Sequence, residues 1–245
     1  MNLMDESKGV YYILLKDLKA YYFKPPNISW GILFPLVLAL AFSLRSPTNL
    51  VELAPGLIAT SAVFGTTSME AIVITFERRT GALERLLLAP ISTKSILVGK
   101  ILGGTVFGVM ISGVMTIIAW LAFNMKIRSL PWFLLILALT LLSLSSLGAL
   151  IAVSVREVFE AQTLSNYFRF PMIFLCGVFI PVSSMPQALQ VIAYLLPLTY
   201  SVDALHSITL GYYTTLNTFI DVIILGLYTL MFSYVADVLL RRSLR

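Results

Sequence analysis

Six apolar stretches run through the 245-residue sequence, and their lengths constrain the fold more than any other feature. Crossing the hydrocarbon core of a bilayer takes about 20 apolar residues in a helix. Lipid offers no partner to backbone amides, so spanning segments are helices or closed barrels, and the alternating pattern of barrel strands is missing here. The sequence therefore predicts an all-α integral membrane protein, a six-transmembrane-helix bundle forming one domain over residues 1–245. The stretches are residues 28–44, 50–75, 101–123, 132–155, 164–180 and 219–240, of which the first and fifth are short.

The composition argues against a soluble domain. Charged residues make up 12% and hydrophobic residues 58%, with a mean hydropathy of +0.91, whereas soluble domains carry roughly 25% charged residues. Residues 1–27 hold four lysines and three acids and lack a clean apolar core, so we expect no cleavable signal peptide. The single cysteine, Cys176, excludes an intrachain disulfide, and a single histidine excludes a multi-histidine metal site within one chain.

Lysine and arginine are distributed as a membrane topology predicts. With the N-terminus in the cytoplasm, thirteen of the seventeen basic residues lie on the inner side. They are Lys8, Lys16, Lys19, Lys24, Arg78, Arg79, Arg85, Lys94, Lys100, Arg156, Arg241, Arg242 and Arg245, while Arg45, Lys126 and Arg128 lie outside and Arg169 is unassigned. We expect a multi-pass protein of the cell membrane with both termini in the cytoplasm. The net charge of +5 then reflects topology and not nucleic-acid binding.

Residues 76–100 form a charged cytoplasmic island between two apolar stretches, with seven of the chain's 29 charged residues. Its middle predicts one short helix: Thr80 can cap the start, and Pro90 stops it. Its apolar face comprises Leu83, Leu86 and Leu87, and its charged residues are Glu77, Arg78, Arg79, Glu84 and Arg85. An amphipathic helix between two spans is suited to binding a water-soluble partner.

Residues 182–217, between the last two spans, hold a second unusual segment. Its apolar piece, residues 188–196, is bracketed by Pro186 and Pro197 and is too short to cross a bilayer. We expect it to dip into the outer leaflet or to plug the outer mouth of the bundle as a re-entrant segment. If the following residues are helical, Asp203 and His206 face one another.

Several local patterns leave two interpretations open. Residues 10–23 suit a helix lying in the membrane interface or a simple anchor for the first span. The small-residue spacing of Gly99, Gly103, Gly104 and Gly108 predicts close helix packing, either within the chain or against a second copy. Glu70, inside the second span, indicates a functional carboxylate or, as we favour, one that is wet or paired with Arg78 or Arg79. The second inner loop, residues 155–163, could touch the same water-soluble partner as residues 76–100, but a solvated turn is the commoner explanation for such a loop.

Motifs for catalysis are missing from the sequence. There is no GxxxxGK[ST], HExxH, CxxC or GxSxG, so any ATP-driven step belongs to another subunit. An intramembrane hydrolase is one alternative, but only His206 could serve as a base and it is predicted outside the hydrocarbon region. A proton-driven secondary transporter is the other, but its acids, Glu70, Asp221 and Asp237, are all predicted near span ends.

Two stretches resemble the type 2 permeases of ABC transporters. ERRTGALERLLLAPISTKSILVGKIL, residues 77–102, resembles their cytoplasmic signature, and residues 170–211 resemble their second hallmark near the C-terminus. The resemblance implies an exporter subunit that pairs with a separate ABC-type ATPase, usually as two permeases and two ATPases. This chain would bind no cofactor, and ATP and Mg would lie on the ATPase.

The resemblance also assigns residues and cargo. It implies ATPase contacts at Glu77, Arg78, Arg79, Gly81, Leu83, Glu84, Arg85, Leu86, Leu87 and Pro90. It maps a re-entrant outer segment onto residues 177–205, marked by Gly177, Pro181, Pro186, Pro197, Tyr200 and Asp203. A homodimer, membrane lipids and an exported drug, lipid or glycan are the implied partners. The aliphatic and aromatic spans favour amphipathic molecules over highly charged polymers.

Overall fold

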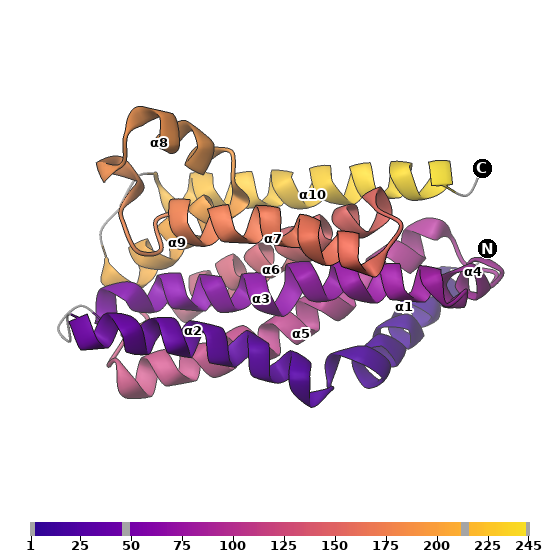
Figure 1. Cartoon of the computed structure of the whole chain (residues 1–245), viewed down its shortest axis with the longest axis horizontal. Coiled ribbons are helices and arrows are strands. Elements are labelled where there is room, and N and C mark those ends of the chain that lie inside the picture. The colour runs from indigo at the N-terminus through magenta and orange to yellow at the C-terminus, as the bar shows by residue number, and fades with distance from the viewer. Residues whose placement is uncertain (1–2, 46–49, 212–215, 244–245) are drawn as a thin grey trace.

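The computed structural model describes residues 3–45, 50–211 and 216–243, and all regular structure in these ranges is helical (Figure 1). Residues 1–2 of the predicted N-terminal segment and 212–215 of the predicted outer segment lie outside the described residues. The elements are α1 (Leu3–Asp17), a π-helical turn η1 (Leu18–Tyr22), α2 (Pro25–Arg45), α3 (Leu50–Arg79), α4 (Ala82–Leu87), α5 (Thr93–Ala122), α6 (Leu130–Ser154), α7 (Val158–Leu175), a 3-10 turn η3 (Val182–Ser184), α8 (Gln187–Tyr194), α9 (Pro197–Leu210) and α10 (Thr218–Ser243).

Within the described ranges, four helices are long and apolar enough to cross a membrane: α3, α5, α6 and α10. Two bent pairs would raise the number to six if each pair is one span. Glu6–Tyr22 and Asn27–Phe42 meet at 88°, and α8 and α9 meet at 92°. An all-helical membrane protein is therefore confirmed, with four to six candidate spans.

The fifth predicted span does not form as one helix. Instead of residues 164–180, α7 covers Val158–Leu175, and the chain turns at Cys176 and at Gly177, whose φ is +84°. The helix also begins inside the predicted second inner loop, because Glu157 and Glu160 form a reciprocal capping box at its start. The solvated turn expected there is thus limited to the residues before Val158.

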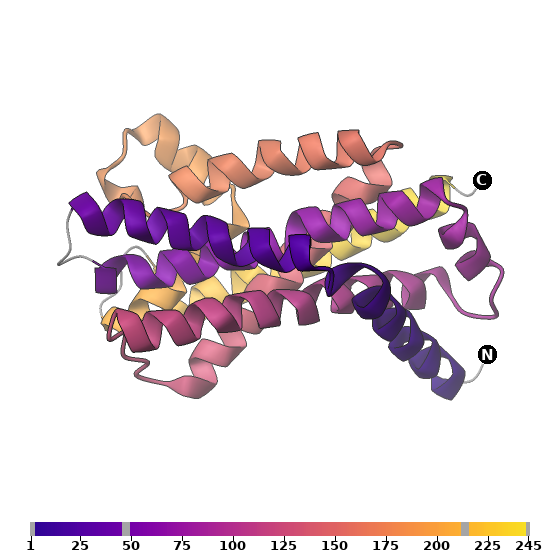
Figure 2. The same cartoon turned by 60° about the horizontal axis from the view of Figure 1, so that its bottom comes forward.

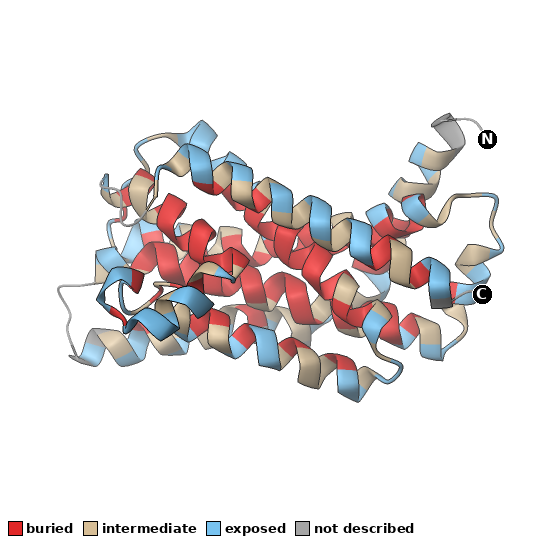
Figure 3. Cartoon of the chain, turned by 90° about the horizontal axis from the view of Figure 1, so that it is seen from above, coloured by how far each residue is buried: buried red, intermediate tan, exposed pale blue. Residues whose placement is uncertain are grey.

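Helix α3 lies at the centre of the bundle and packs against α2, α5, α6, α7 and α9. Of its apolar window, 83% is buried, against 22% for α10, which lies at the periphery. Figure 3 shows the buried residues concentrated along the inner helices and the exposed ones on the outside. Leu57 and Ile58 of α3 pack in the main core cluster with Ile136 and Leu141 of α6.

The glycines of α5 pack against helices of the same chain. A Cβ atom added at Gly104 would overlap Glu70 of α3, and one at Gly108 would overlap Thr66, also of α3. A Cβ atom at Gly99 would press on Ile13 of α1. The close packing predicted from the glycine spacing therefore has an intrachain partner on both sides of α5.

Helix α1 turns away from the direction of α2, as Figure 2 shows. Its buried residues include Ile13, and the following turn buries Leu18 and Tyr22, while Tyr11 and Tyr12 are exposed. This apolar face packs on α5. The helix has a buried side and an exposed side, and both interpretations of residues 10–23, as an interfacial helix or as an anchor for the first span, remain open.

The proline-bracketed piece forms the short helix α8. Pro186 caps its start, and Pro197 opens α9 after the 92° bend. Each member of the predicted Asp203–His206 pair has a hydrogen-bond partner elsewhere. Asp203 accepts from the backbone N–H of Leu216 at 2.7 Å, and His206 Nε2 lies 3.1 Å from the carbonyl oxygen of Glu52.

Candidate functional site

The short helix predicted in the cytoplasmic island is present as α4, Ala82–Leu87. It ends three residues before Pro90, as expected. Its predicted cap is wrong, because the Thr80 hydroxyl donates to the carbonyl of Phe76 at 3.1 Å and so belongs to the end of α3. Gly81 occupies the N-cap position with φ +69°, a conformation that glycine adopts without steric cost. The chain thereby reverses between α3 and α4 at a single residue.

Helix α4 has one face on the protein and one face free. Leu83 is buried, and Leu86 and Leu87 pack on the same cluster, which includes Ile96 and Leu97 of α5. On the other side Glu84, Arg85, Leu88 and Pro90 are exposed, and Leu88 has 86% of its surface free. We call these four residues the outer face of α4.

The charged residues before α4 take different places from those expected, because they form the last turn of α3. Glu77 is fully buried, so it does not belong to the exposed surface assigned to it. Arg78 donates to the carbonyl of Val155 at 3.4 Å, and Arg79 lies 3.8 Å from the carboxylate of Glu157. These two arginines therefore join the end of α3 to the connection between α6 and α7.

A buried ion cluster lies beneath α4 and consists of Lys16, Asp17, Glu77 and Lys100. Lys100 Nζ lies 2.8 Å from the carboxylate of Asp17 and also binds Glu77. Lys16 binds Glu77 and lies 3.1 Å from Asp17. Lys100, Asp17 and Glu77 have at most 1% of their side chains exposed. Two cations and two anions balance, which is how buried charges are tolerated.

The cluster joins α1, α3 and α5. Burial raises the pKa of the Asp17 carboxyl, and the neighbouring Lys100 ammonium opposes that shift. Burial also acts to lower the pKa of Lys16, but the hydrogen bond to Glu77 and the charge of Asp17 outweigh it and raise the pKa. A further link between α1 and α5 is the Ser95 hydroxyl, which donates to the Glu6 carboxylate at 2.7 Å.

Glu70 lies deeper along α3 than the ion cluster and is fully buried. The favoured prediction, that it is wet or paired with Arg78 or Arg79, is wrong. The Tyr22 hydroxyl donates to one of its carboxylate oxygens, and the other has no hydrogen-bond partner among the described residues. Tyr22 follows α1, so this contact is a second polar tie between the N-terminal helix and the centre of the bundle.

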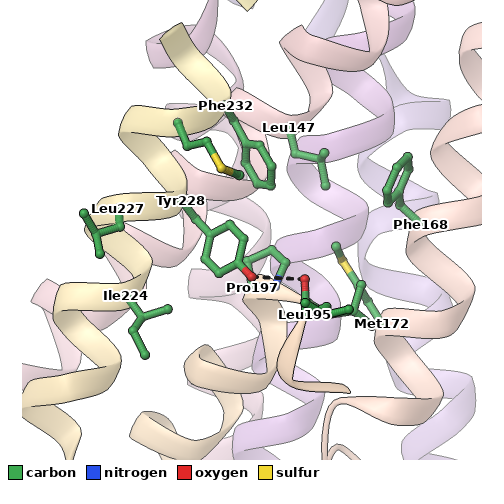
Figure 4. Close-up of a pocket in the computed structure, with 11 residues that line it drawn as sticks. Leu147, Phe168, Met172, Leu195, Pro197, Ile224, Leu227, Tyr228 and Phe232 are labelled. Carbon is green, nitrogen blue, oxygen red and sulfur yellow. Dashed lines mark hydrogen bonds between the residues drawn. The ribbon is translucent and has the colours of Figure 1, made fainter. Parts of the chain in front are cut away.

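An apolar cavity of about 690 Å³ lies between α6, α7 and α10, beside the bend between α8 and α9 (Figure 4). The Tyr228 hydroxyl donates to the carbonyl of Leu195 at the bend, at 3.1 Å. The cavity is lined by Leu147, Phe168, Met172, Leu195, Leu196, Pro197, Ile224, Leu227, Tyr228, Met231 and Phe232. Of the six residues that mark the predicted outer segment, Pro197 contributes to this lining and the other five do not.

Together these features define a helical membrane protein with a short amphipathic helix, α4, packed on an apolar cluster, and a buried ion cluster that joins α1, α3 and α5. Comparison with known sequences supplies its family. The family described as ABC-2 type transporter matches residues 9–210, and the chain belongs to that family. This confirms the predicted resemblance and places the chain among transport permeases.

Individual relatives agree with the family. The chain is 31% identical over 209 residues to Nodulation protein J of Rhizobium leguminosarum bv. viciae, covering 78% of this chain and 74% of that protein. It is 31% identical over 169 residues to Nodulation protein J of Rhizobium meliloti strain 1021, covering 65% and 61%. It is 25% identical over 154 residues to the inner membrane transport permease YadH of Escherichia coli strain K12, covering 62% and 59%.

Proposed function

We propose that this chain is the transmembrane subunit of an ABC exporter and that a separate ATPase docks on the outer face of α4. The observation that carries this is the combination of exposed Glu84 and Arg85 with a buried Leu83 on the same six-residue helix, followed directly by the exposed Leu88. Membership in the ABC-2 family implies a partner ATPase. ATP and Mg bind to that subunit, and two copies of this chain form the conduit.

The proposed orientation and cargo follow from the sequence. Both termini and α4 face the cytoplasm, in keeping with the positive-inside rule. The cargo is an amphipathic drug, lipid or glycan-type molecule, which suits spans that are mainly aliphatic and aromatic. The family and the relatives' names support transport without selecting among these cargoes.

The contacts of α4 suggest how movement passes inward. Leu83 packs in the cluster that contains the first turn of α5, so a push on α4 acts on α5. Lys100 then ties α5 to α1 and α3. The ATPase supplies the free energy, and the permease contributes a different affinity for cargo in its two states.

Charge reversal at Glu84 tests the docking. We expect Glu84→Lys to leave membrane insertion intact and to weaken ATPase capture roughly tenfold, about 1.4 kcal/mol. Co-purification with the ATPase and cargo-stimulated ATP turnover measure the effect. Glu52→Lys, at an exposed acid at the other end of α3, is the matched control. Unchanged capture in Glu84→Lys, or full transport by the chain reconstituted alone, overturns the proposal.

The proton-driven alternative has one test, because two of the acids that it would use lie buried inside helices. Glu70 and Asp221 have at most 1% of their surface exposed, and neither Asp221 oxygen has a hydrogen-bond partner among the described residues. Buried acids in spans are common in proton relays. If dissipating the proton gradient at constant ATP stops transport, the secondary transporter is favoured; unchanged transport favours the ABC exporter.

A further inference from the structure

Arg169 of α7 is a buried cation with an unusual environment. Only 6% of its surface is exposed, and its guanidinium lies over the ring of Phe64, 4.2 Å from the ring centre. Among the described residues it forms no ion pair, and its Nε has no hydrogen-bond partner. By contrast, the other buried cation, Lys100, binds two carboxylates. Charged residues within membrane helices are usually paired, so this one calls for a ligand.

Two further buried groups lack a partner on the same two helices. The hydroxyls of Ser165 and Ser68 have no hydrogen-bond partner within the described part of the chain. Ser165 precedes Arg169 by four residues on α7, and Ser68 follows Phe64 by four residues on α3. Helices α3 and α7 run antiparallel and pack together (Figure 1), so both serines lie on the same side of the Arg169–Phe64 contact, one turn away. We call Arg169, Ser165 and Ser68 the oxyanion triad.

Aromatic rings flank the triad. The Phe64 ring lies 4.5 Å from that of Phe34 of α2. Further along α7, Phe174 contacts Phe179, which stacks on Phe42 of α2 at 4.6 Å. Phe174 has 53% of its surface exposed. One aromatic pair, Phe64 with Phe34, therefore lies at the buried cation, and a second group, Phe174, Phe179 and Phe42, lies between the later part of α7, the residues that follow it and α2.

We propose that the oxyanion triad binds the anionic head of an amphiphile, a phosphate, sulfate or carboxylate, whose apolar body lies on the aromatic rings. A guanidinium presents parallel N–H donors that match such groups bidentately, and two hydroxyls add donors. The anionic head is proposed to accept hydrogen bonds from these three groups. That this amphiphile is the exported cargo rests on the proposed function, whereas the binding itself does not.

The test uses the full chain purified in a neutral detergent, with n-dodecyl phosphate as probe. Dodecyltrimethylammonium has the same tail and the opposite charge. We expect the phosphate to bind the native chain and Arg169→Gln to weaken that binding roughly tenfold or more, as for loss of a charged hydrogen-bonded pair. Arg169→Lys keeps the positive charge but lacks the parallel N–H donors of a guanidinium, so its affinity for dodecyl phosphate should lie between those of the native chain and of Arg169→Gln. Arg242→Gln, at an exposed arginine of α10, should bind as the native chain does.

Thermal unfolding gives an independent readout. Without probe, Arg169→Gln should unfold at the same or a higher temperature, because it removes an unpaired buried cation. Dodecyl phosphate should raise the unfolding temperature of the native chain and of Arg242→Gln, but not that of Arg169→Gln. If Arg169→Gln does not fold, Arg169→Lys combined with Ser165→Ala carries the same comparison. Equal phosphate affinity in the Arg169 variants and the native chain, or equal binding of the cationic probe, overturns the proposal.

Two arms separate the sources of the oxyanion. If a membrane phospholipid occupies the site, native mass spectrometry finds it on the native chain and on Arg242→Gln but not on Arg169→Gln. If cargo occupies it, dodecyl phosphate stimulates ATP turnover by the permease with its ATPase. Failure of the ATPase to bind while dodecyl phosphate still binds refutes the proposed function and leaves the site standing. If the ATPase binds but dodecyl phosphate does not, the proposed binding site is refuted and the proposed function stands.

Discussion

Lys100 holds three helices together, because its ammonium binds the carboxylates of Asp17 and Glu77. Removing one partner of a buried ion group leaves uncompensated charge and costs about 3–5 kcal/mol. We therefore expect Lys100→Met to lower the free energy of unfolding by roughly that amount. Thermal unfolding in detergent measures it. Lys94→Met, which removes an exposed lysine one and a half turns earlier, is the control, and equal loss in both variants contradicts the assigned role.

Two glycines of α5 offer a matched test of close packing. A methyl group at Gly104 would overlap the Glu70 carboxylate and the Ser145 hydroxyl, whereas nothing lies within 4 Å of one at Gly113. We expect Gly104→Ala to destabilise the bundle by about 1–3 kcal/mol through overpacking. Gly113→Ala should stabilise it by up to about 1 kcal/mol through helix propensity. Unfolding temperatures of the two variants that shift in the same direction would show that α5 does not pack as described.

Helix α4 shows what local sequence can and cannot predict. Its leucine spacing and Pro90 predicted a short amphipathic helix correctly, since both signals act within a few residues. The start was misplaced because Thr80 satisfies the usual cap preference, yet its hydroxyl serves α3 instead. The fifth span was misplaced for a related reason, since an apolar run continues through residues 176–180 although the backbone turns there.

The ion cluster could not be predicted, because its partners are far apart in sequence. Lys100 and Asp17 are separated by 83 residues, and Lys16 and Glu77 by 61. In the sequence these residues look like the positive-inside charges and solvated acids that flank any span. A charged residue inside an apolar helical run, as Lys100 is, was the one available signal, and Arg169 carried the same signal.

Gly81, in the turn before α4, allows a test of how this helix is placed. A valine at φ +69° is strained by about 1–2 kcal/mol. We expect Gly81→Val to relieve this strain by moving α4 away from α5. We expect weaker ATPase capture with membrane insertion retained, measured by co-purification. Thr80→Ala removes a hydroxyl that does not cap α4. We therefore expect it to change the free energy of ATPase binding by no more than an ordinary surface substitution does, about 0.5 kcal/mol. A larger loss in Thr80→Ala than in Gly81→Val would restore the cap assigned to Thr80.

At the scale of the whole molecule, α4 and the turn between α5 and α6 lie at opposite ends of the bundle (Figure 1). This arrangement makes the proposed topology measurable. Cys176 is buried, so its replacement by alanine gives a background for single-cysteine labelling. Leu88 is 86% exposed beside α4, and Leu130 is 58% exposed at the start of α6.

With a membrane-impermeant maleimide on intact cells, we expect Leu130→Cys to be labelled and Leu88→Cys to react only after permeabilisation. Both positions are exposed on the protein, so the side of the membrane on which each lies decides the outcome. Labelling of Leu88→Cys in intact cells, with Leu130→Cys protected, would show that the topology is opposite to the proposed one. Helix α4 would then lie on the side of the membrane away from a cytoplasmic ATPase. Equal labelling of both in permeabilised cells is the control for reactivity.

The separation between Asp17 and Lys100 also has a consequence for biosynthesis. The ribosome delivers Lys100 after 83 further residues, about 4–17 s later at roughly 5–20 residues per second. Until then only one of the two ammonium groups that lie against Asp17, that of Lys16, has been translated. The four-residue ion cluster is therefore completed only when the third long hydrophobic segment has been synthesised, so the final packing of the N-terminal helix is a late step in the assembly of the bundle.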